Sequence, residues 1–407
     1  MAKPSVALVH YSAPPVIGGV EFVLEEQARQ FLAAGFPVEV VVGEGARFHD
    51  QIPLTVVPEL STRYQPAQEA LARLSQGDPL DFKEAAQNLT RRLAHIASDI
   101  NCIIIHNILT MHFNLLATAA LAGLIAQEEE KKFIAWVHDA TFNDPDYAAQ
   151  RRGQYPWEII SRPIPQVIYV AISQRRKEEL ARLFGWDEAR ITVVPDGVNM
   201  EAFLALDTEA LRLCREFSVA DLDFLALTPT RIVKRKNLEL GMALVAEIKA
   251  RGKRIKWFIT GAPDPHNPPS QQYFAWLKER RKALSLEDDV IFLAEFLGKS
   301  VNFSLLRSLY SLADFLLLPS RQEGFGMPVL EGALFRLPVV ATNIAPFEAV
   351  GGEDVIYIGL DEEPAEAAER TLSFLEKNPS YHLRHRTLKG YTWQAVFEKH
   401  IRPLVEA

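Results

Sequence analysis

Two glutamates eight positions apart lie in the segment with the clearest potential for chemistry. Glu323 and Glu331 follow an apolar, strand-like run at residues 314–318, and Pro328 between them predicts the start of a helix. Ligands of open α/β sheets bind at the carboxyl ends of strands, and the free amides of a helix start suit a phosphate or a sugar hydroxyl. An isolated pair of glutamates would more often be a solvated loop residue and a helix-dipole residue. With Gly324 and Gly326 beside it, the pair is better interpreted as two carboxylates that hold different hydroxyls of one ligand.

A basic loop follows another predicted strand in the second half of the chain. Arg231 and Lys236 are five positions apart in the run 230–237, which comes after the strand-like segment 224–227. Guanidinium groups grip phosphate oxygens in pairs and lysine acts as a point charge, so the two can converge on one anion. The alternative is a basic surface loop for nucleic acid. The strand-end position and the acidic chain favour the anion site.

The first half of the chain offers weaker motifs. Gly18 and Gly19 separate the first strand from the first helix, which by itself indicates only a turn. After the second strand, Gly43 and Gly45 stand without a third glycine, which counts against a dinucleotide-binding dehydrogenase.

One histidine follows a strand of the first half. His138 stands with Asp139 at the end of the strand 133–137, where it could face a cleft between domains or be a hydrogen-bonded surface histidine. His106, His112 and His138 are too scattered along the chain to predict a metal site.

The elements that must position these residues alternate between short apolar strands and longer helical segments. This alternation predicts an α/β fold of parallel sheets with helices on both faces, and it restarts near residue 200, which indicates two doubly wound domains. We expect strands at residues 6–10, 38–42, 102–105, 133–137, 167–171, 191–194, 224–227, 256–259, 290–293, 314–318 and 338–341. We expect helices at 21–34, 115–126, 238–250 and 329–335, a helical pair within 63–97, and an amphipathic helix at 392–401 that Pro403 should end.

Composition narrows the class of protein. The 407 residues are enough for two to three domains. With 44 Lys and Arg against 52 Asp and Glu, the net charge of −8 disfavours a nucleic-acid partner. Two cysteines make neither a disulfide framework nor a zinc site, and the N-terminus lacks the apolar region of a signal peptide, so we expect a reduced, cytoplasmic protein.

Together these motifs resemble the retaining glycosyltransferases of family 4, which have the two-Rossmann architecture called GT-B. The resemblance covers nearly the whole chain, with Gly35-Phe36 standing where the family often has Gly-His. The residues that carry it are Gly18, Gly19, Glu21, His138, the segment 194–199, Arg231, Lys236, Glu323, Glu331 and Trp393.

The resemblance implies a role for each motif. Glu331 would hold the ribose hydroxyls of a nucleotide, and Glu323 would hold the hydroxyls of the donor sugar. Arg231 and Lys236 would stabilise the leaving diphosphate in place of a metal, and His138 would contact the donor sugar near its reacting carbon. No cofactor or metal is expected. The other implied donor-binding residues are Gly18, Gly19, Phe325, Gly326 and Met327.

The resemblance also implies the domains and the activity. Residues 1–197 would bind the acceptor, with a C-terminal helix at 391–407 crossing back onto them, and 198–390 would bind the donor across a central cleft. A hexose would pass from a nucleotide diphosphate sugar to a small-molecule, glycan or lipid-linked acceptor. The loops 261–269 and 343–347 favour GDP-mannose slightly over UDP-glucose.

Two other functions remain as alternatives. A nucleotide-sugar epimerase or hydrolase of the same fold lacks this combination of Arg, Lys and paired Glu, and a non-catalytic nucleotide-sugar-binding protein would form no product. Five basic residues could contact an anionic acceptor or a lipid surface: Arg151, Arg152, Arg175, Arg176 and Lys177. Basic runs of this kind are more often the solvated face of a helix.

Overall fold

The computed structural model describes residues 3–150, 153–264, 266–298 and 301–407. Arg151 and Arg152 of the basic group lie outside the described residues, as does Pro265 of the loop 261–269. The chain divides into two compact units: unit 1 is Met1–Asn199 with Gly390–Ala407, and unit 2 is Met200–Lys389. Each unit is described by itself.

The described residues of unit 1 form a parallel sheet of seven strands in the order β3-β2-β1-β4-β5-β6-β7. Every residue of β1 is buried, as a central strand covered on both faces requires, so its sequence reads as a continuous apolar run rather than an alternating one. The order reverses between β1 and β4. Both β2 and β4 pair with β1, and each register begins at Val6. The strands are β1 (Val6–Ser12), β2 (Val38–Glu44), β3 (Leu54–Val56), β4 (Cys102–His106), β5 (Lys132–Val137), β6 (Val167–Ala171) and β7 (Ile191–Val193).

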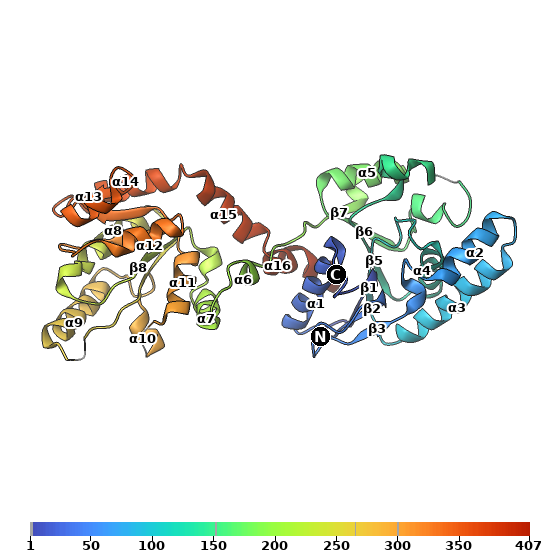
Figure 1. Cartoon of the computed structure of the whole chain (residues 1–407), viewed down its shortest axis with the longest axis horizontal. Helices are drawn as coiled ribbons and strands as arrows, with labels where there is room; N and C mark the ends of the chain where they lie inside the picture. The colour runs from blue at the N-terminus through green and yellow to red at the C-terminus, as the bar shows by residue number, and fades with distance from the viewer. Residues whose placement is uncertain (1–2, 151–152, 265, 299–300) are drawn as a thin grey trace. The chain divides into compact units, whose positions relative to one another are not determined.

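Helices cover both faces of this sheet (Figure 1). One core lies between the sheet and α3, α4 and α5, and the other lies between the sheet and α1 with the C-terminal segment. The predicted buried helix and helical pair are confirmed as α4 and as α2 with α3. The helices of unit 1 are α1 (Gly19–Ala33), α2 (Gln65–Ser75), α3 (Leu80–Ile96), α4 (Leu115–Gln127), α5 (Gln174–Phe184), α16 (Trp393–Val396) and α17 (Arg402–Glu406).

The C-terminal segment does not end where we expected. Pro403 lies in the first turn of α17 instead of ending the helix, so that prediction is wrong. A π-helical turn, Phe397–Ile401, precedes it. In the first turn of a helix the backbone N–H groups have no acceptor within the helix, so the missing N–H of proline costs no hydrogen bond there. The turn also directs Phe397 into unit 1, where its ring packs edge-to-face on Phe31 with centroids 5.0 Å apart.

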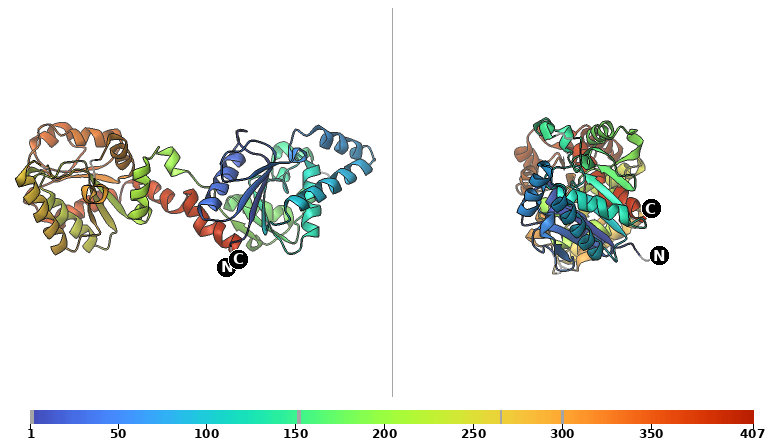
Figure 2. Two further views of the ribbon diagram at one scale, coloured as in Figure 1. Left: turned by 90° about the horizontal axis from the view of Figure 1, so that it is seen from below. Right: turned by 90° about the vertical axis from the view of Figure 1, so that its right-hand side faces the viewer.

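The described residues of unit 2 form a second parallel sheet, of six strands in the order β10-β9-β8-β11-β12-β13. Its order reverses between β8 and β11. Figure 2 shows both sheets between their helices from a second direction. The strands are β8 (Phe224–Thr228), β9 (Ile255–Ile259), β10 (Val290–Phe292), β11 (Phe315–Leu318), β12 (Val339–Thr342) and β13 (Ile356–Ile358). The helices are α6 (Met200–Phe203), α7 (Thr208–Glu216), α8 (Leu238–Ala250), α9 (Pro268–Ala283), α10 (Leu293–Leu297), α11 (Phe303–Leu312), α12 (Met327–Leu334), α13 (Ala345–Gly351), α14 (Pro364–Leu375) and α15 (Pro379–Gly390).

Two doubly wound α/β units in one chain confirm the predicted fold class. The GT-B architecture consists of two such units. Two edge strands, β3 and β13, were not predicted. Each has three residues and is only partly buried, so neither carries the apolar run that identified the central strands. In the part of the chain that the structure describes, no helix combines the length and apolar character needed to cross a membrane.

Candidate functional site

The strongest sequence motifs of unit 2 follow the two strands where its sheet order reverses. The loop after β8 carries Arg231 and Lys236, and the loop after β11 carries Glu323. Open α/β sheets bind ligands in the crevice at the carboxyl ends of strands at such a switch point. The topology therefore places the basic loop and the first glutamate at the expected binding position of a doubly wound unit.

Backbone contacts hold these two loops together. The amide of Arg321 donates to the carbonyl of Arg235 at 2.8 Å, and the Arg235 guanidinium donates to the carbonyl of Gln322 at 3.1 Å. Gly261, which follows β9, packs against the loop after β8. A Cβ at Gly261 would lie 2.0 Å from the carbonyl oxygen of Thr230, so only glycine permits this approach.

The charges of the two loops meet at Glu323. Lys236 Nζ donates to its Oε1 at 2.5 Å, Ser320 Oγ donates to the same oxygen at 2.7 Å, and Arg235 lies 3.4 Å from its Oε2. The Lys236 and Glu323 side chains are only 11% and 10% exposed. Arg231 is exposed and makes no ion pair with the residues that the structure describes. Arg235 was not singled out among the basic residues of this loop, and it reaches the cluster because it lies in a 3₁₀ turn, Lys234–Lys236.

The loop after β11 ends in the amides expected to contact the sugar. Gly326 caps α12 with φ of 103°, and a Cβ there would lie 2.9 Å from Val350 Cγ2. Both the left-handed backbone and the close packing require glycine. The neighbouring side chains of Phe325 and Met327 are more than half exposed, so the start of α12 is open to a ligand.

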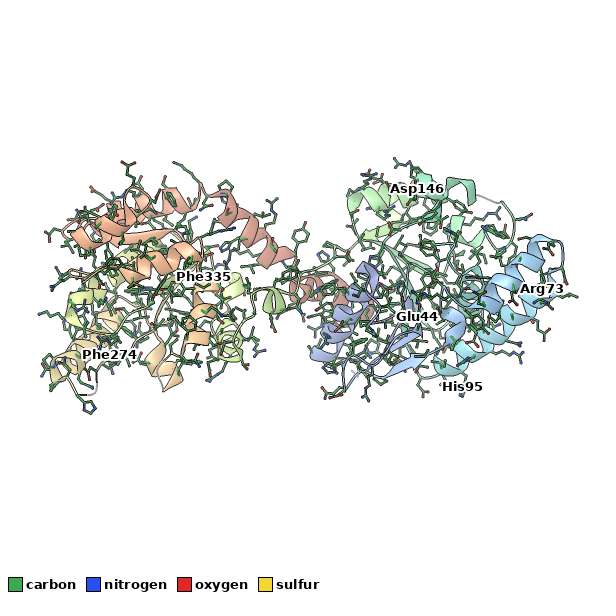
Figure 3. All side chains as sticks on the ribbon, viewed as in Figure 1. Glu44, Arg73, His95, Asp146, Phe274 and Phe335 are labelled. Atoms are coloured by element: carbon green, nitrogen blue, oxygen red, sulfur yellow. The ribbon has the colours of Figure 1, made fainter. Side chains whose placement is uncertain are left out.

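Glu331 lies on α12 and has a partner that the sequence did not indicate. The hydroxyl of Tyr310, on α11, donates to Glu331 Oε2. Burial and the Glu331 carboxylate raise the pKa of Tyr310, which therefore stays a donor. Its ring stacks on Phe335, labelled in Figure 3, with centroids 5.2 Å apart. The tyrosine orients the carboxylate of Glu331, which is partly exposed.

In unit 1, three histidines meet at the carboxyl ends of neighbouring strands. His10 lies near the end of β1, His106 ends β4, and His138 follows β5. His106 Nδ1 is 3.4 Å from His138 Nε2, with the two rings stacked at 5.7 Å. His10 Nδ1 is 3.0 Å from the carbonyl oxygen of His106. His106 and His138 are far apart along the chain, yet they lie side by side because the sheet order places β4 beside β5.

This histidine cluster is neutral. Burial lowers the pKa of His10 and His106. Burial, with smaller contributions from the neighbouring His10 and the Arg176 cation, lowers the pKa of His138 to about 3. Burial also raises the pKa of Asp196 to about 6, and its Oδ2 lies 3.9 Å from His138 Nδ1. Among the described residues, no three His, Cys, Asp or Glu side chains are grouped so as to hold a metal ion.

Asn107 fixes the position of His138. Its Oδ1 accepts from the amides of His138 and Asp139 at 2.8 and 3.1 Å. Asn107 is buried and adopts φ of 59°, a conformation that a non-glycine residue keeps only when its surroundings enforce it. Thr110 Oγ1 donates to the Asp139 carbonyl at 2.7 Å, so the loops after β4 and β5 are joined.

The glycine turn after β1 packs on the histidine cluster. A Cβ at Gly18 would lie 2.1 Å from Glu21 Oε2, whereas Gly19 has open space. Glu21 accepts from Ser12 Oγ at 2.5 Å and lies 3.8 Å from His10 Nε2. Gly18 thus makes room for a buried carboxylate, and Gly19 leaves the backbone accessible. Neither His10 nor Glu21 was among the expected site residues, although His10 lies near the carboxyl end of β1 and Glu21 lies in the first turn of α1.

The predicted residues therefore fall into two groups. Unit 1 holds Gly18, Gly19 and His138, and unit 2 holds Arg231, Lys236, Glu323, Phe325, Gly326, Met327 and Glu331. Within unit 2, Lys236 and Glu323 are in direct contact, which the separate roles expected for them did not anticipate.

Two family models match successive parts of the chain. The model described as Glycosyltransferase Family 4 matches residues 17–202, and the model described as Glycosyl transferases group 1 matches residues 215–389. Together the two matches take in most of the chain.

Individual relatives match more distantly. A mannosylglucosylglycerate synthase of Petrotoga mobilis is 27% identical over 290 residues, which are 64% of this chain and 64% of that protein. The protein of the same name from Thermotoga maritima is 27% identical over 297 residues, 68% of this chain and 65% of its own. An O-antigen chain mannosyltransferase of Salmonella typhimurium is 39% identical over 80 residues, 20% of this chain and 21% of that protein. The chain thus spans just under two thirds of the length of the first two relatives.

Proposed function

This chain belongs to the family 4 glycosyltransferases, and we propose that it transfers a hexose from a nucleotide diphosphate sugar with retention of the anomeric configuration. The observation that carries the proposal is the charged cluster at the switch point of unit 2. It combines an exposed Arg231 and two paired cations with a carboxylate whose side chain is only 10% exposed, beside an open helix start. Such a set suits a ligand with an anionic part and a hydroxylated part.

The cations would receive the leaving diphosphate. Breaking the bond between sugar and phosphate develops negative charge on the nucleotide side, and positioned positive charge stabilises that transition state. Arg231 is exposed and free of ion pairs within the described residues, while Lys236 and Arg235 now face Glu323. We infer that the donor exchanges these contacts: the diphosphate takes Lys236, and the sugar hydroxyls take Glu323.

The ribose would bind to Glu331. Glu331 is partly exposed, so its carboxylate can accept from a pair of hydroxyls, and the buried Tyr310 orients it. The amides at the start of α12 would bind sugar or phosphate oxygens near Gly326, as helix starts commonly do.

The acceptor would bind to unit 1. Aromatic rings cluster on the loops after β4 and β5, the second of which carries His138. His112 lies 4.9 Å from Phe113 and 4.8 Å from Tyr147, measured between ring centroids, and Phe113 is 41% exposed. Ligand sites typically combine aromatic surface with a few fixed polar groups. Small-molecule, glycan and lipid-linked acceptors all remain candidates.

For the donor we favour GDP-mannose over UDP-glucose. The support is the mannosyl group in the names of the relatives above, together with the loops 261–269 and 343–347. We propose that the reaction needs no divalent metal, since Arg231 and Lys236 supply the opposing charge.

A thermal-shift screen of UDP, GDP, ADP and their sugars, followed by product analysis, tests the function. A ligand at 100 times its Kd should stabilise the protein by about 2.7 kcal/mol. We expect GDP and GDP-mannose to give the largest shift, and the mannoside formed with a sugar acceptor to keep the donor's anomeric configuration by NMR. Binding without transfer to any sugar, glycan or lipid-linked acceptor would indicate a nucleotide-sugar-binding protein instead.

A further inference from the structure

The contact between His106 and His138 restricts where each ring carries its proton. Both imidazoles are neutral, so each has one N–H and one bare nitrogen. His106 Nδ1 faces His138 Nε2 at 3.4 Å. Only one proton fits between the two nitrogens, and it belongs to either His106 or His138.

The other nitrogen of His106 distinguishes the two arrangements. His106 is fully buried, and its Nε2 has no hydrogen-bond partner among the described residues. If His138 donated, His106 would carry its own proton on Nε2, as a buried N–H without an acceptor. Orphaned buried N–H groups are rarer than unsatisfied acceptors. The arrangement in which His106 Nδ1 donates leaves only a lone pair unpaired.

The surroundings of His138 favour the same arrangement. If its Nε2 accepts from His106, its proton must be on Nδ1. That nitrogen lies 3.9 Å from Asp196 Oδ2, beyond hydrogen-bond distance but close enough for the carboxylate to attract an N–H on this side of the ring. The amides held by Asn107 fix the backbone at His138, so the ring has a defined direction.

We propose that His106 is a positioning residue that locks His138 in the tautomer with its proton on Nδ1. His138 then offers a hydrogen-bond donor on the side of Asp196 and has no free lone pair there. Resting on the proposed function, this means that His138 presents a hydrogen-bond donor at Nδ1 to a substrate oxygen and does not act as a base that removes the acceptor's proton.

Nitrogen NMR of the full chain with ¹⁵N-labelled histidine tests the tautomer without requiring activity. Ring nitrogens with and without a proton differ widely in chemical shift, and the variant His138→Gln identifies the signals of His138 by their loss. We expect a protonated Nδ1 and a bare Nε2 at His138 near neutral pH. The opposite tautomer would overturn the proposal, whether or not the protein transfers sugar.

Substitution of His106 tests the positioning role. His106→Phe removes the donor and should release His138 to a mixture of tautomers, lowering kcat about tenfold, the effect of one hydrogen bond, with the donor KM within about twofold. His106→Asn places an amide N–H near the position of Nδ1 and should restore both the tautomer and most of kcat. His95→Phe, on the exposed end of α3, is the control. If His106→Phe leaves the His138 tautomer unchanged, His106 does not set it.

Discussion

The two switch points of this chain carry opposite kinds of polar cluster. At that of unit 2, Lys236 and Arg235 surround a carboxylate, and the charges persist because each has a partner or reaches water. At that of unit 1, three histidines are buried against one another and are neutral. Both clusters occupy the carboxyl ends of parallel strands, so the topology gives the location while the loop residues determine the chemistry.

The difference follows from how burial is compensated. A buried ion is tolerated when a counter-ion and hydrogen bonds replace its water, as Lys236 and Ser320 do for Glu323. His106 lies beside His10 and His138, which offer it no counter-ion, and burial therefore shifts its pKa towards the neutral form. We infer that unit 2 balances charge during the reaction, whereas unit 1 contributes directed hydrogen bonds.

The largest effect should come from removing the cations of unit 2. In the double variant Arg231→Ala/Lys236→Ala the developing charge of the diphosphate loses its counter-charges, so kcat should fall about 10³-fold. Steady-state kinetics with the donor found in the screen measures this. Lys234→Ala, exposed on the same 3₁₀ turn, is the matched control and should retain activity. If kcat of the double variant stayed within tenfold of the wild-type value, charge balance would not be the role of unit 2.

Glu323 should give the next largest effect. Its proposed partner, the donor sugar, changes shape and charge in the transition state, so Glu323→Ala should lower kcat about 10²-fold. Free nucleotide diphosphate lacks the sugar, and its binding should stay unchanged or tighten because Lys236 is released from its ion pair. Calorimetry distinguishes these outcomes. Weaker nucleotide binding with unaltered kcat would mean that Glu323 contacts the nucleotide.

The fold was more accessible from sequence than the contacts of the site. Central strands such as β1 are buried along their whole length, and that is a local signal. The pairing of Lys236 with Glu323 joins residues 87 positions apart, and it depends on β8 lying beside β11. His10 and Tyr310 were missed for the same reason. No spacing within one segment indicates a partner that arrives from another strand or helix.

Acid should destabilise the protein through the histidine cluster. A native pKa of about 3 for His138, against 6.5 for an ordinary histidine, means that the unfolded chain binds more protons between these values. Stability from this residue is therefore present above pH 6.5 and lost as the pH falls, by about 2 kcal/mol between pH 7 and pH 5. Denaturant unfolding at several pH values should show a shallower acid loss for His138→Gln than for the wild type. His95→Gln, on the exposed end of α3, should follow the wild-type profile, and an unchanged slope in His138→Gln would contradict the neutral cluster.

Glu331 should give a smaller effect of a different kind. The ribose does not react, so its contact with Glu331 is equal in the ground and transition states. Glu331→Ala should raise the donor KM about tenfold and leave kcat nearly unchanged. Nucleotide diphosphate binding should weaken in parallel, and Tyr310→Phe, which removes only the orienting hydroxyl, should weaken it less. If Glu331→Ala lowers kcat while Glu323→Ala raises KM, the two carboxylates have been assigned the wrong way round.

The smallest expected effect is that of removing divalent metal, and it tests the comparison most directly. A metal-dependent enzyme would use carboxylates such as Glu323 and Glu331 to hold a cation against the diphosphate. Here Glu323 is already neutralised by Lys236 and Arg235, so a divalent ion would have to displace two cations to reach it. Initial rates with EDTA should therefore stay within about twofold of rates with added magnesium or manganese. Activity lost in EDTA and restored by manganese would show that the protein's own cations are insufficient, and unit 2 would then differ from unit 1 by a metal rather than by its basic loop.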